Sequence, residues 1–200
     1  MTCEPDSRLF GGSLPLSCFV LVNMRTTNAV SKPKMGIGRS NGLAGVIANC
    51  HSALTYARHV GLPVIHVCGN EIEETSDACC RWLNGFAPEH DDAVLYRKTG
   101  SCYSSPFFSA KVQENGNTLI MAGFLGRGGS LMTGADAYRA GHRITFLSDA
   151  IYDDLPGVTL SQNSIQLLRT YAHFAVEVQS TGRWIDKVSH FPVSKTLSTN

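Results

Sequence analysis

An apolar run that leads into a glycine-rich turn is the feature that most constrains how this chain folds. Residues 118–122 (TLIMA) are followed by 123–129 (GFLGRGG), and Ser130 then opens a helical run to Ala140. This order predicts a buried strand, a tight turn and a helix, because glycine adopts positive φ and lets backbone approach a ligand. The first N–H groups of a helix lack intrahelical partners, so the turn is the best candidate for a site.

Strand and helix patterns alternate along the rest of the chain. Apolar runs predict strands at 17–22, 63–68, 93–96, 118–122, 143–147 and 175–178, and helical spacing predicts helices at 43–60, 77–83, 130–140 and 162–174. The alternation predicts the α/β class, as a doubly wound, three-layer α/β/α fold with a central parallel sheet. Ligands of such sheets collect outside the carboxyl ends of the strands. Asn23, Gly69, Asn70, Lys98 and the turn 126–130 should therefore surround one crevice.

The composition limits the class of partner. The 200 residues are 43% hydrophobic, which suits one domain with a substantial core, and no linker divides them. We expect a single domain over 1–200, with its core at 18–178, an N-terminal arm at 1–16 and a tail at 180–200. Seventeen basic and sixteen acidic side chains give a net charge of +1, which predicts no nucleic-acid partner. A small neutral or mildly anionic ligand fits this charge better.

The location and the cysteine chemistry follow from the same sequence. No apolar stretch approaches the roughly 20 residues of a spanning helix, and the first residues lack the order of a signal peptide. We therefore expect a cytoplasmic protein with no membrane partner. The seven cysteines are scattered and form no C-x-x-C pair, so neither a disulfide framework nor a zinc site is predicted. Most should be small buried hydrophobic residues.

Several segments, taken in order, resemble the isochorismatase-like cysteine hydrolases. They are 19–24 (FVLVNM), 57–65 (ARHVGLPVI), 96–98 (YRK) with 105–108 (SPFF), 120–123 (IMAG) through 136–138 (DAY), and 148–150 (SDA), which matches the loop after a strand. The resemblance covers about residues 18–178. It implies the α/β/α fold of that family, hydrolysis of a small metabolite, no cofactor, and a homo-oligomer that is a dimer or a tetramer.

The resemblance also implies an active site that this chain has altered. Family amidases use an Asp, a Lys and a Cys, and the corresponding catalytic places here hold Asn23, Lys98 and Gly129. An amide neither donates nor accepts a proton at useful pH, and glycine supplies no nucleophile, so covalent thiol chemistry is not expected. The family branch that hydrolyses a vinyl ether also carries glycine at the nucleophile place, although it keeps the Asp.

Several assignments stay open. Arg97 can occupy the lysine place instead of Lys98, because the span from Lys98 to Phe107 is longer than the usual family spacing. Arg127 can form a bidentate ion pair with a carboxylate or point to solvent. Ser130 can cap the helix or act as a nucleophile. The residues expected to contact substrate are Asn70, Phe107, Gly126, Arg127, Gly128 and Ser130.

The segment after the second strand offers carboxylates but no histidine. Glu71, Glu73 or Glu74 can replace the missing Asp and restore acid–base chemistry. Family nicotinamidases bind metal through histidines, one of them in this segment, so no metal is predicted here. Two functions stay open. One is a hydrolase that acts without a cysteine nucleophile, by vinyl-ether or substrate-assisted chemistry, and the other is a silent protein that binds a metabolite or assembles with an active partner.

Overall fold

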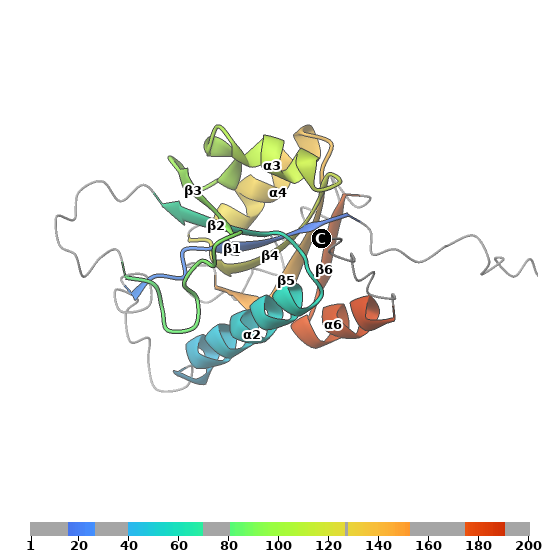
Figure 1. Ribbon diagram of the computed structural model, residues 1–200. Helices are drawn as coiled ribbons and strands as arrows, with labels where there is room; N and C mark the ends of the chain where they lie inside the picture. The colour runs from blue at the N-terminus through green and yellow to red at the C-terminus, as the bar shows by residue number, and fades with distance from the viewer. Residues whose placement is uncertain (1–15, 27–39, 70–80, 127, 153–174, 191–200) are drawn as a thin grey trace, which may run out of the picture.

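One parallel sheet forms the centre of the molecule (Figure 1). The computed structural model describes residues 16–26, 40–69, 81–126, 128–152 and 175–190. The six strands are β1 (Cys18–Val22), β2 (Val64–Gly69), β3 (Ala93–Arg97), β4 (Thr118–Phe124), β5 (Arg143–Tyr152) and β6 (Val176–Gln179). Their order is β3-β2-β1-β4-β5-β6, and every neighbouring pair is parallel. The predicted α/β class with a central parallel sheet is confirmed.

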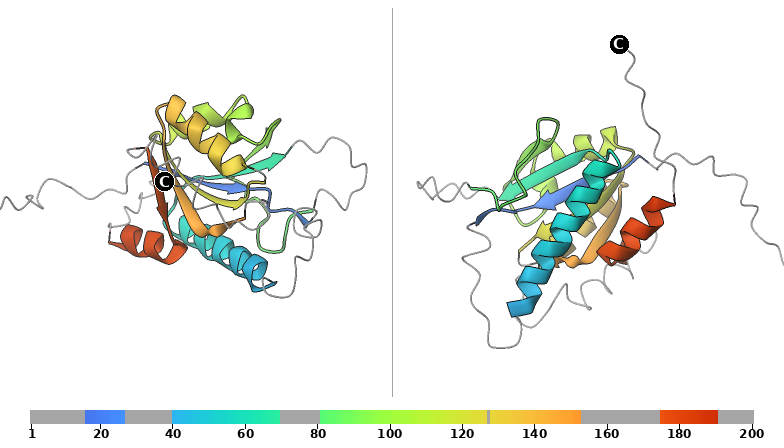
Figure 2. Two further views of the ribbon diagram at one scale, coloured as in Figure 1. Left: turned by 180° about the vertical axis from the view of Figure 1, so that it is seen from behind. Right: turned by 60° about the horizontal axis from the view of Figure 1, so that its bottom comes forward.

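Helices cover both faces of the sheet, as Figures 1 and 2 show. On one face lie α2 (Ser40–His59) and α6 (Thr181–Ser189), and on the other lie α3 (Phe108–Glu114), α4 (Gly129–Arg139) and the 3₁₀ turn η2 (Cys102–Ser104). Each face has its own buried apolar cluster. Val20 belongs to the α3/α4 side, whereas Phe19 and Leu21 belong to the α2/α6 side. Burial on both faces explains why β1 is continuously apolar, and the predicted three layers are confirmed.

Two segments differ from the secondary structure predicted from the sequence. Residues 148–150, predicted as a loop, form the second half of β5. Side chains of α2 support this extension, because Asn49 and Cys50 donate to the carbonyl oxygens of Asp149 and Ala150. Residues 81–83 were predicted to be the end of a helix. Instead, Trp82 forms an isolated antiparallel β-bridge with Arg25, which follows β1. The helix predicted at 162–174 lies outside the described residues.

Trp184 brings α6 into the packed core. Its indole is buried, stacks on Phe19 at a centroid distance of 5.9 Å and meets Tyr56 edge-on at 5.6 Å. Asp149 in the second half of β5 accepts hydrogen bonds from the N–H and the hydroxyl of Thr181, which fixes the start of the helix. The packed unit therefore extends beyond residue 178 through α6. None of the helices that the structure describes has the length and apolarity needed to cross a membrane.

Gly123 on β4 packs directly against the backbone of β1. Its φ is +109°, and the pairing of β4 with β5 shifts register between Met121 and Gly123. A Cβ at Gly123 would lie 2.3 Å from the carbonyl oxygen of Val22 on β1. Only glycine fits this contact, and the irregularity bends the end of β4 just before the glycine-rich turn.

Replacing Gly123 should therefore be costly. We expect Gly123→Ala to lower the free energy of unfolding by more than about 3 kcal/mol, because the new methyl group meets backbone that cannot move alone. Gly141→Ala is the matched control, since Gly141 also has a positive φ of +72° but no atom within 4 Å of an added Cβ. It should cost only about 1–2 kcal/mol of backbone strain. Urea unfolding of both variants measures this, and equal losses would contradict the steric argument.

Candidate ligand site at the carboxyl edge of the sheet

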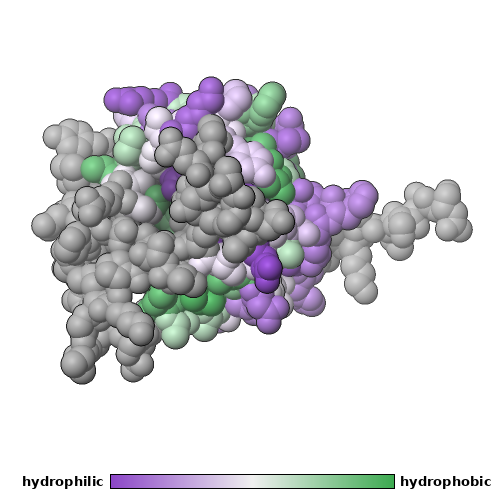
Figure 3. All heavy atoms as spheres, turned by 90° about the vertical axis from the view of Figure 1, so that its left-hand side faces the viewer, coloured by the Kyte–Doolittle hydropathy of each residue, from purple (hydrophilic) through white to green (hydrophobic). Residues whose placement is uncertain are grey.

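The candidate site lies where the strand order reverses. From β1 the sheet continues to β2 and β3 on one side and to β4 on the other, and doubly wound sheets bind ligands at this point. Asn23 follows β1, and the glycine-rich turn joins β4 to α4. Strands β1 and β2 run toward the left in Figure 1, and Figure 3 views the molecule from that side, where polar and apolar described residues are mixed.

Asn23 joins the ends of three strands. Its φ of +52° is left-handed, a conformation that asparagine tolerates better than most residues. The side-chain Oδ1 accepts from the N–H of Gly69 on β2 at 2.6 Å, and Nδ2 donates to the carbonyl oxygen of Phe124 on β4 at 3.2 Å. The residue is only 8% exposed. Backbone groups thus engage both the donor and the acceptor of this amide, which makes Asn23 a structural link.

Of the two cationic alternatives, Arg97 lies beside Gly129. Side chains alternate along β3, so Arg97 faces the α3/α4 layer and is 6% exposed, whereas Lys98 is exposed. The guanidinium donates to the carbonyl oxygen of Gly100 and, at 2.8 Å, to that of Leu125. A Cβ at Gly129 would lie 3.5 Å from Nη1 of Arg97. Of the two alternatives for the lysine place, Arg97 is therefore the one whose side chain lies beside Gly129.

The loop after β3 is tied to α4 at two points. The hydroxyl of Ser101 donates to Asp136 at 2.7 Å, and the N–H of Cys102 donates to Thr133 Oγ1 at 3.2 Å. Asp136 and Thr133 are three residues apart on one helix, so they present both acceptors on the same side. These bonds hold the loop that closes over Arg97 against the helix that begins at Gly129.

Cys102 is not available as a nucleophile. The four cysteines that the structure describes are buried, as predicted: Cys18, Cys50, Cys68 and Cys102. Burial raises the pKa of the Cys102 thiol to about 11, although the neighbouring Arg97 charge and its hydrogen bonds oppose that rise. The thiol is therefore protonated at neutral pH and shielded from solvent, and a thiol in that state is unreactive.

The glycine-rich turn is open on one side. Gly126 and Gly128 have φ values of +78° and +67°, and an added Cβ at either would meet no atom within 4 Å. Gly128 stands at the N-cap of α4, so Ser130 is not the cap. The hydroxyl of Ser130 is buried and has no hydrogen-bond partner in the part of the chain that the structure describes. Without an adjacent base, this hydroxyl is not activated as a nucleophile.

Of the other residues predicted to contact substrate or to supply a carboxylate, Phe107 is the one that the structure describes. It is the N-cap residue of α3 and is 65% exposed. Asn70, Arg127, Glu71, Glu73 and Glu74 lie outside the described residues.

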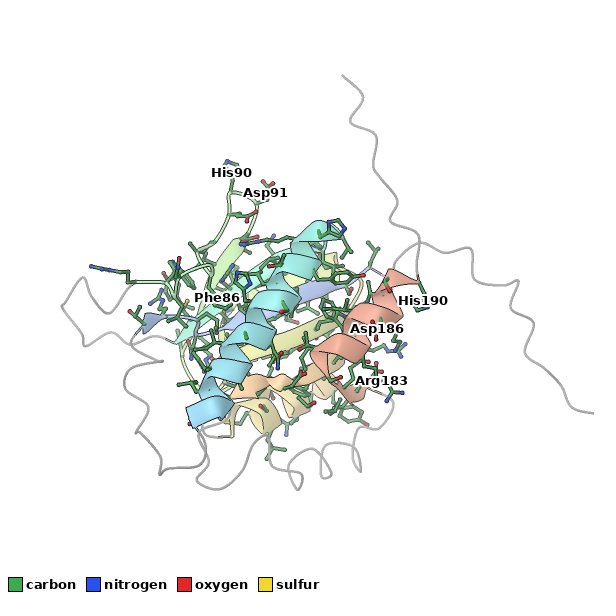
Figure 4. The ribbon with its side chains drawn as sticks, turned by 90° about the horizontal axis from the view of Figure 1, so that it is seen from below. Phe86, His90, Asp91, Arg183, Asp186 and His190 are labelled. Carbon is green, nitrogen blue, oxygen red and sulfur yellow. The ribbon has the colours of Figure 1, made fainter. Side chains whose placement is uncertain are left out.

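A buried polar network on the other side of the sheet has a structural role. His66 Nε2 lies 3.1 Å from Asp92 Oδ2, which also accepts from Arg58 Nη2 at 2.6 Å. Burial lowers the pKa of His66 even though Asp92 opposes the shift, so the imidazole is neutral at pH 7. His90 and Asp91 of the same loop lie at an exposed tip (Figure 4). Among the described residues, no group of three His, Cys, Asp or Glu side chains could hold a metal ion.

The sequence contained signals for some residues that the interpretation missed. Arg97, considered only as an alternative to Lys98, shares strand parity with Ala93 and Leu95, which pack against the α3/α4-side core, so counting alternate residues along β3 would have predicted that it is the buried one of the two. Thr133 and Asp136 share a face of the predicted helix at 130–140. No local pattern marks His66, because its partners come from distant segments.

Comparisons with known proteins identify the fold. No family model and no curated protein matches the sequence. Solved structures do match. An isochorismatase family protein from Desulfovibrio vulgaris has a TM-score of 0.68 at 15% identity, covering 88% of this chain and 100% of that one. An isochorismatase from Pseudomonas putida has a TM-score of 0.64 at 19% identity, with coverages of 84% and 90%.

An enzyme of a different stated activity has the same architecture. N-carbamoylsarcosine amidase from Thermoplasma acidophilum matches with a TM-score of 0.61 at 19% identity, covering 82% of this chain and 96% of that one. The fold thus belongs to the class of three-layer α/β/α proteins with a parallel sheet. Within that class, this chain has the isochorismatase-like fold.

The link made by Asn23 predicts a pH-dependent stability change. In Asn23→Asp, an ionised carboxylate would face the carbonyl oxygen of Phe124 instead of donating to it, so we expect a loss of about 1–3 kcal/mol at pH 7.5. This repulsion raises the folded-state pKa of the new carboxyl above its unfolded value of about 4. Stability is therefore lost as pH rises through that raised pKa, and the deficit should shrink at pH 4.5.

Urea unfolding at both pH values, relative to the unmodified protein, measures this deficit. Asn117→Asp is the matched control, because Asn117 also has a positive φ of +57° but is exposed. It should stay within about 0.5 kcal/mol at either pH. A deficit for Asn23→Asp that does not change with pH would show that the Phe124 contact is not its cause.

The tie between the β3 loop and α4 predicts coupled stability losses. Ser101→Ala and Asp136→Ala should each cost about 1–3 kcal/mol, and the double variant should cost little more than either, because both remove one charge-assisted bond. Arg139→Ala is the control, since its exposed ion pair with Asp136 is worth about 0–1 kcal/mol. A double-mutant cycle by chemical unfolding checks this, and additive losses would rule out the coupling.

Proposed function

We propose that this protein binds a small metabolite at the candidate site and is catalytically silent toward thiol-dependent hydrolysis. The observation that carries the proposal is the set of groups beside the glycine-rich turn. Arg97 packs against Gly129, where a nucleophile would stand, and the amide of Asn23 is engaged by backbone.

None of these groups moves a proton near neutral pH. An amide does not titrate, a guanidinium stays protonated in proteins, and glycine has no side chain. Losing one general acid or base typically lowers a rate by roughly 10²- to 10⁴-fold, and the nucleophile is missing in addition. Ligand binding needs neither a proton-transferring group nor a nucleophile. The protein can therefore lack both and still bind a small molecule.

Backbone and fold support a retained ligand site. The turn is open at Gly126 and Gly128, and the first turn of α4 offers N–H donors at the switch point of the sheet. The similar structures include an isochorismatase and an N-carbamoylsarcosine amidase, whose names refer to small molecules. A cytoplasmic location, which rests on the sequence pattern, and a homo-oligomeric state, dimer or tetramer, which rests on the resemblance, are further proposals.

Gly129 favours a second candidate function. Glycine at this place resembles the branch that hydrolyses a vinyl ether, a reaction that needs no thiol. In that case the substrate supplies much of the reactivity, and Arg97 polarises it. The difference between the candidates is whether the unmodified protein turns over a substrate.

Steady-state assays of the unmodified protein separate the two functions. With isochorismate and with N-carbamoylsarcosine we expect no turnover above buffer, because no described residue of the site can transfer a proton. The Asn23→Asp, Gly129→Cys double variant restores an acid and a thiol. It tests whether the lack of these two groups is the reason for the absence of turnover. Turnover by the unmodified protein that disappears in Arg97→Met would overturn the silent function and establish the second candidate.

A further inference from the structure

Residues 81–92, which lead into β3, are held beside the chain that leaves β1. The N–H of Leu83 donates to the carbonyl oxygen of Met24 at 3.0 Å, and the N–H of Thr26 donates to that of Arg81 at 2.9 Å. These two bonds form a short antiparallel ladder. The position of the segment therefore affects the chain immediately beyond the end of β1, where the candidate site lies.

The other end of the segment is attached through one carboxylate. Oδ2 of Asp92 accepts from Nη2 of Arg58 on α2 at 2.6 Å and lies 3.1 Å from Nε2 of His66 on β2. The same oxygen accepts from the N–H of Glu89 at 2.8 Å. Arg58 also donates to the carbonyl oxygen of Ala87 at 3.2 Å. One small cluster thus fastens the segment to a helix and to the sheet.

His66 occupies this cluster with an uncharged ring. Its side chain is fully buried, and Nε2 carries the proton because the partner, a carboxylate, can only accept. Nδ1 is also buried and bonds to nothing in the part of the chain that the structure describes. A second proton would create an N–H group without an acceptor in the interior, and it would add a second positive charge beside Arg58.

The other neighbours of His66 do not change this charge balance. Those on the same face of the sheet or against the ring are uncharged between about pH 5 and pH 7.5. They are Leu21, Cys68, Trp82, Val94 and Tyr96. The charged groups are Arg58 and Asp92, with Glu89 beyond Arg58 at 3.0 Å from its Nη1.

Acid therefore acts on the cluster through His66. Burial lowers the pKa of this ring, and the charge of Arg58 adds to the shift while Asp92 opposes it. The closed state thus binds fewer protons than an open one, in which the pKa is about 6.5. The stability of the closed state is complete above that value and is lost as pH falls from about 6.5 toward the lowered pKa. Although burial opposes it, the N–H of Glu89 and the Arg58 guanidinium lower the pKa of Asp92 below its usual 3.8, so this carboxylate stays ionised in that range.

We propose that His66, Asp92 and Arg58 form an acid-sensitive latch. Uncharged His66 holds segment 81–92 closed, and its protonation releases the segment together with the ladder that borders the candidate site. Opening lets water reach the ring, which removes the cost of the second proton. The latch operates whether or not the candidate site binds a metabolite.

Amide hydrogen exchange of the full chain at pH 7.5 and pH 5.5, followed by NMR, tests the latch. We expect the amides of Leu83 and Thr26 to exchange at least about threefold faster at pH 5.5, after correction for the intrinsic rate at each pH. An ordinary histidine pKa sets a ceiling of about tenfold. The amides of β4 should keep their protection, because the release is local.

A matched pair of variants separates the latch from a general effect of acid. His66→Gln keeps an N–H donor for Asp92 but does not titrate, so the ratio of the two exchange rates should fall to about one. His90→Gln is the control, because His90 belongs to the same segment but lies at its exposed tip (Figure 4). This variant should keep the ratio of the unmodified protein.

Ring NMR of the unmodified protein keeps the test decisive if His66→Gln does not fold. The His66 ring, identified by its contact with Trp82, should be less than about a quarter protonated at pH 6.5, where an ordinary histidine is half protonated. A half-protonated ring while Leu83 and Thr26 stay protected would overturn the proposal. So would an exchange ratio near one in the unmodified protein, an unchanged ratio in His66→Gln, or an equal loss of protection in β4.

Discussion

The amide of Asn23 is the interaction on which the geometry of the candidate site depends. It stands at the end of β1, accepts from β2 and donates to β4, so it joins the two halves of the doubly wound sheet at the point where they diverge. Gly123 allows this closeness because β1 and β4 leave no room for a side chain. The glycine-rich turn begins directly beyond this junction, and its position relative to Arg97 follows from the junction.

Structural hydrogen bonds occupy the places where the resemblance implies proton transfer. Asn23 links strands, and Arg97 binds carbonyl oxygen atoms of the two segments that flank Gly129. An amide does not titrate and a guanidinium stays protonated, so neither group transfers a proton near neutral pH. The fold nevertheless keeps features that catalysis and binding share, a buried cation and a helix N-terminus at the switch point. The proposed binding of a small metabolite is consistent with both facts.

The periodicity of the sequence predicted the strands well because burial on both faces demands apolar side chains at consecutive positions. It predicted the core helices α2 and α4 for the same kind of reason. Segments with a weaker apolar pattern were predicted incorrectly. The second half of β5 is polar enough to suggest a loop, yet α2 side chains satisfy its carbonyl groups. Ser130 is a residue type that often caps helices, but the N-cap of α4 is Gly128, two residues earlier.

Local sequence by itself determined the layers, the parallel sheet and the glycine-rich turn, since these depend on hydrophobic period and on residues that permit positive φ. Tertiary structure alone decided what the polar residues do. The partners of the Asn23 amide lie 46 and 101 residues away along the chain, and the carbonyl of Leu125 lies 28 residues from Arg97. Strand pairing brings such groups together, and no local pattern encodes which distant atoms meet.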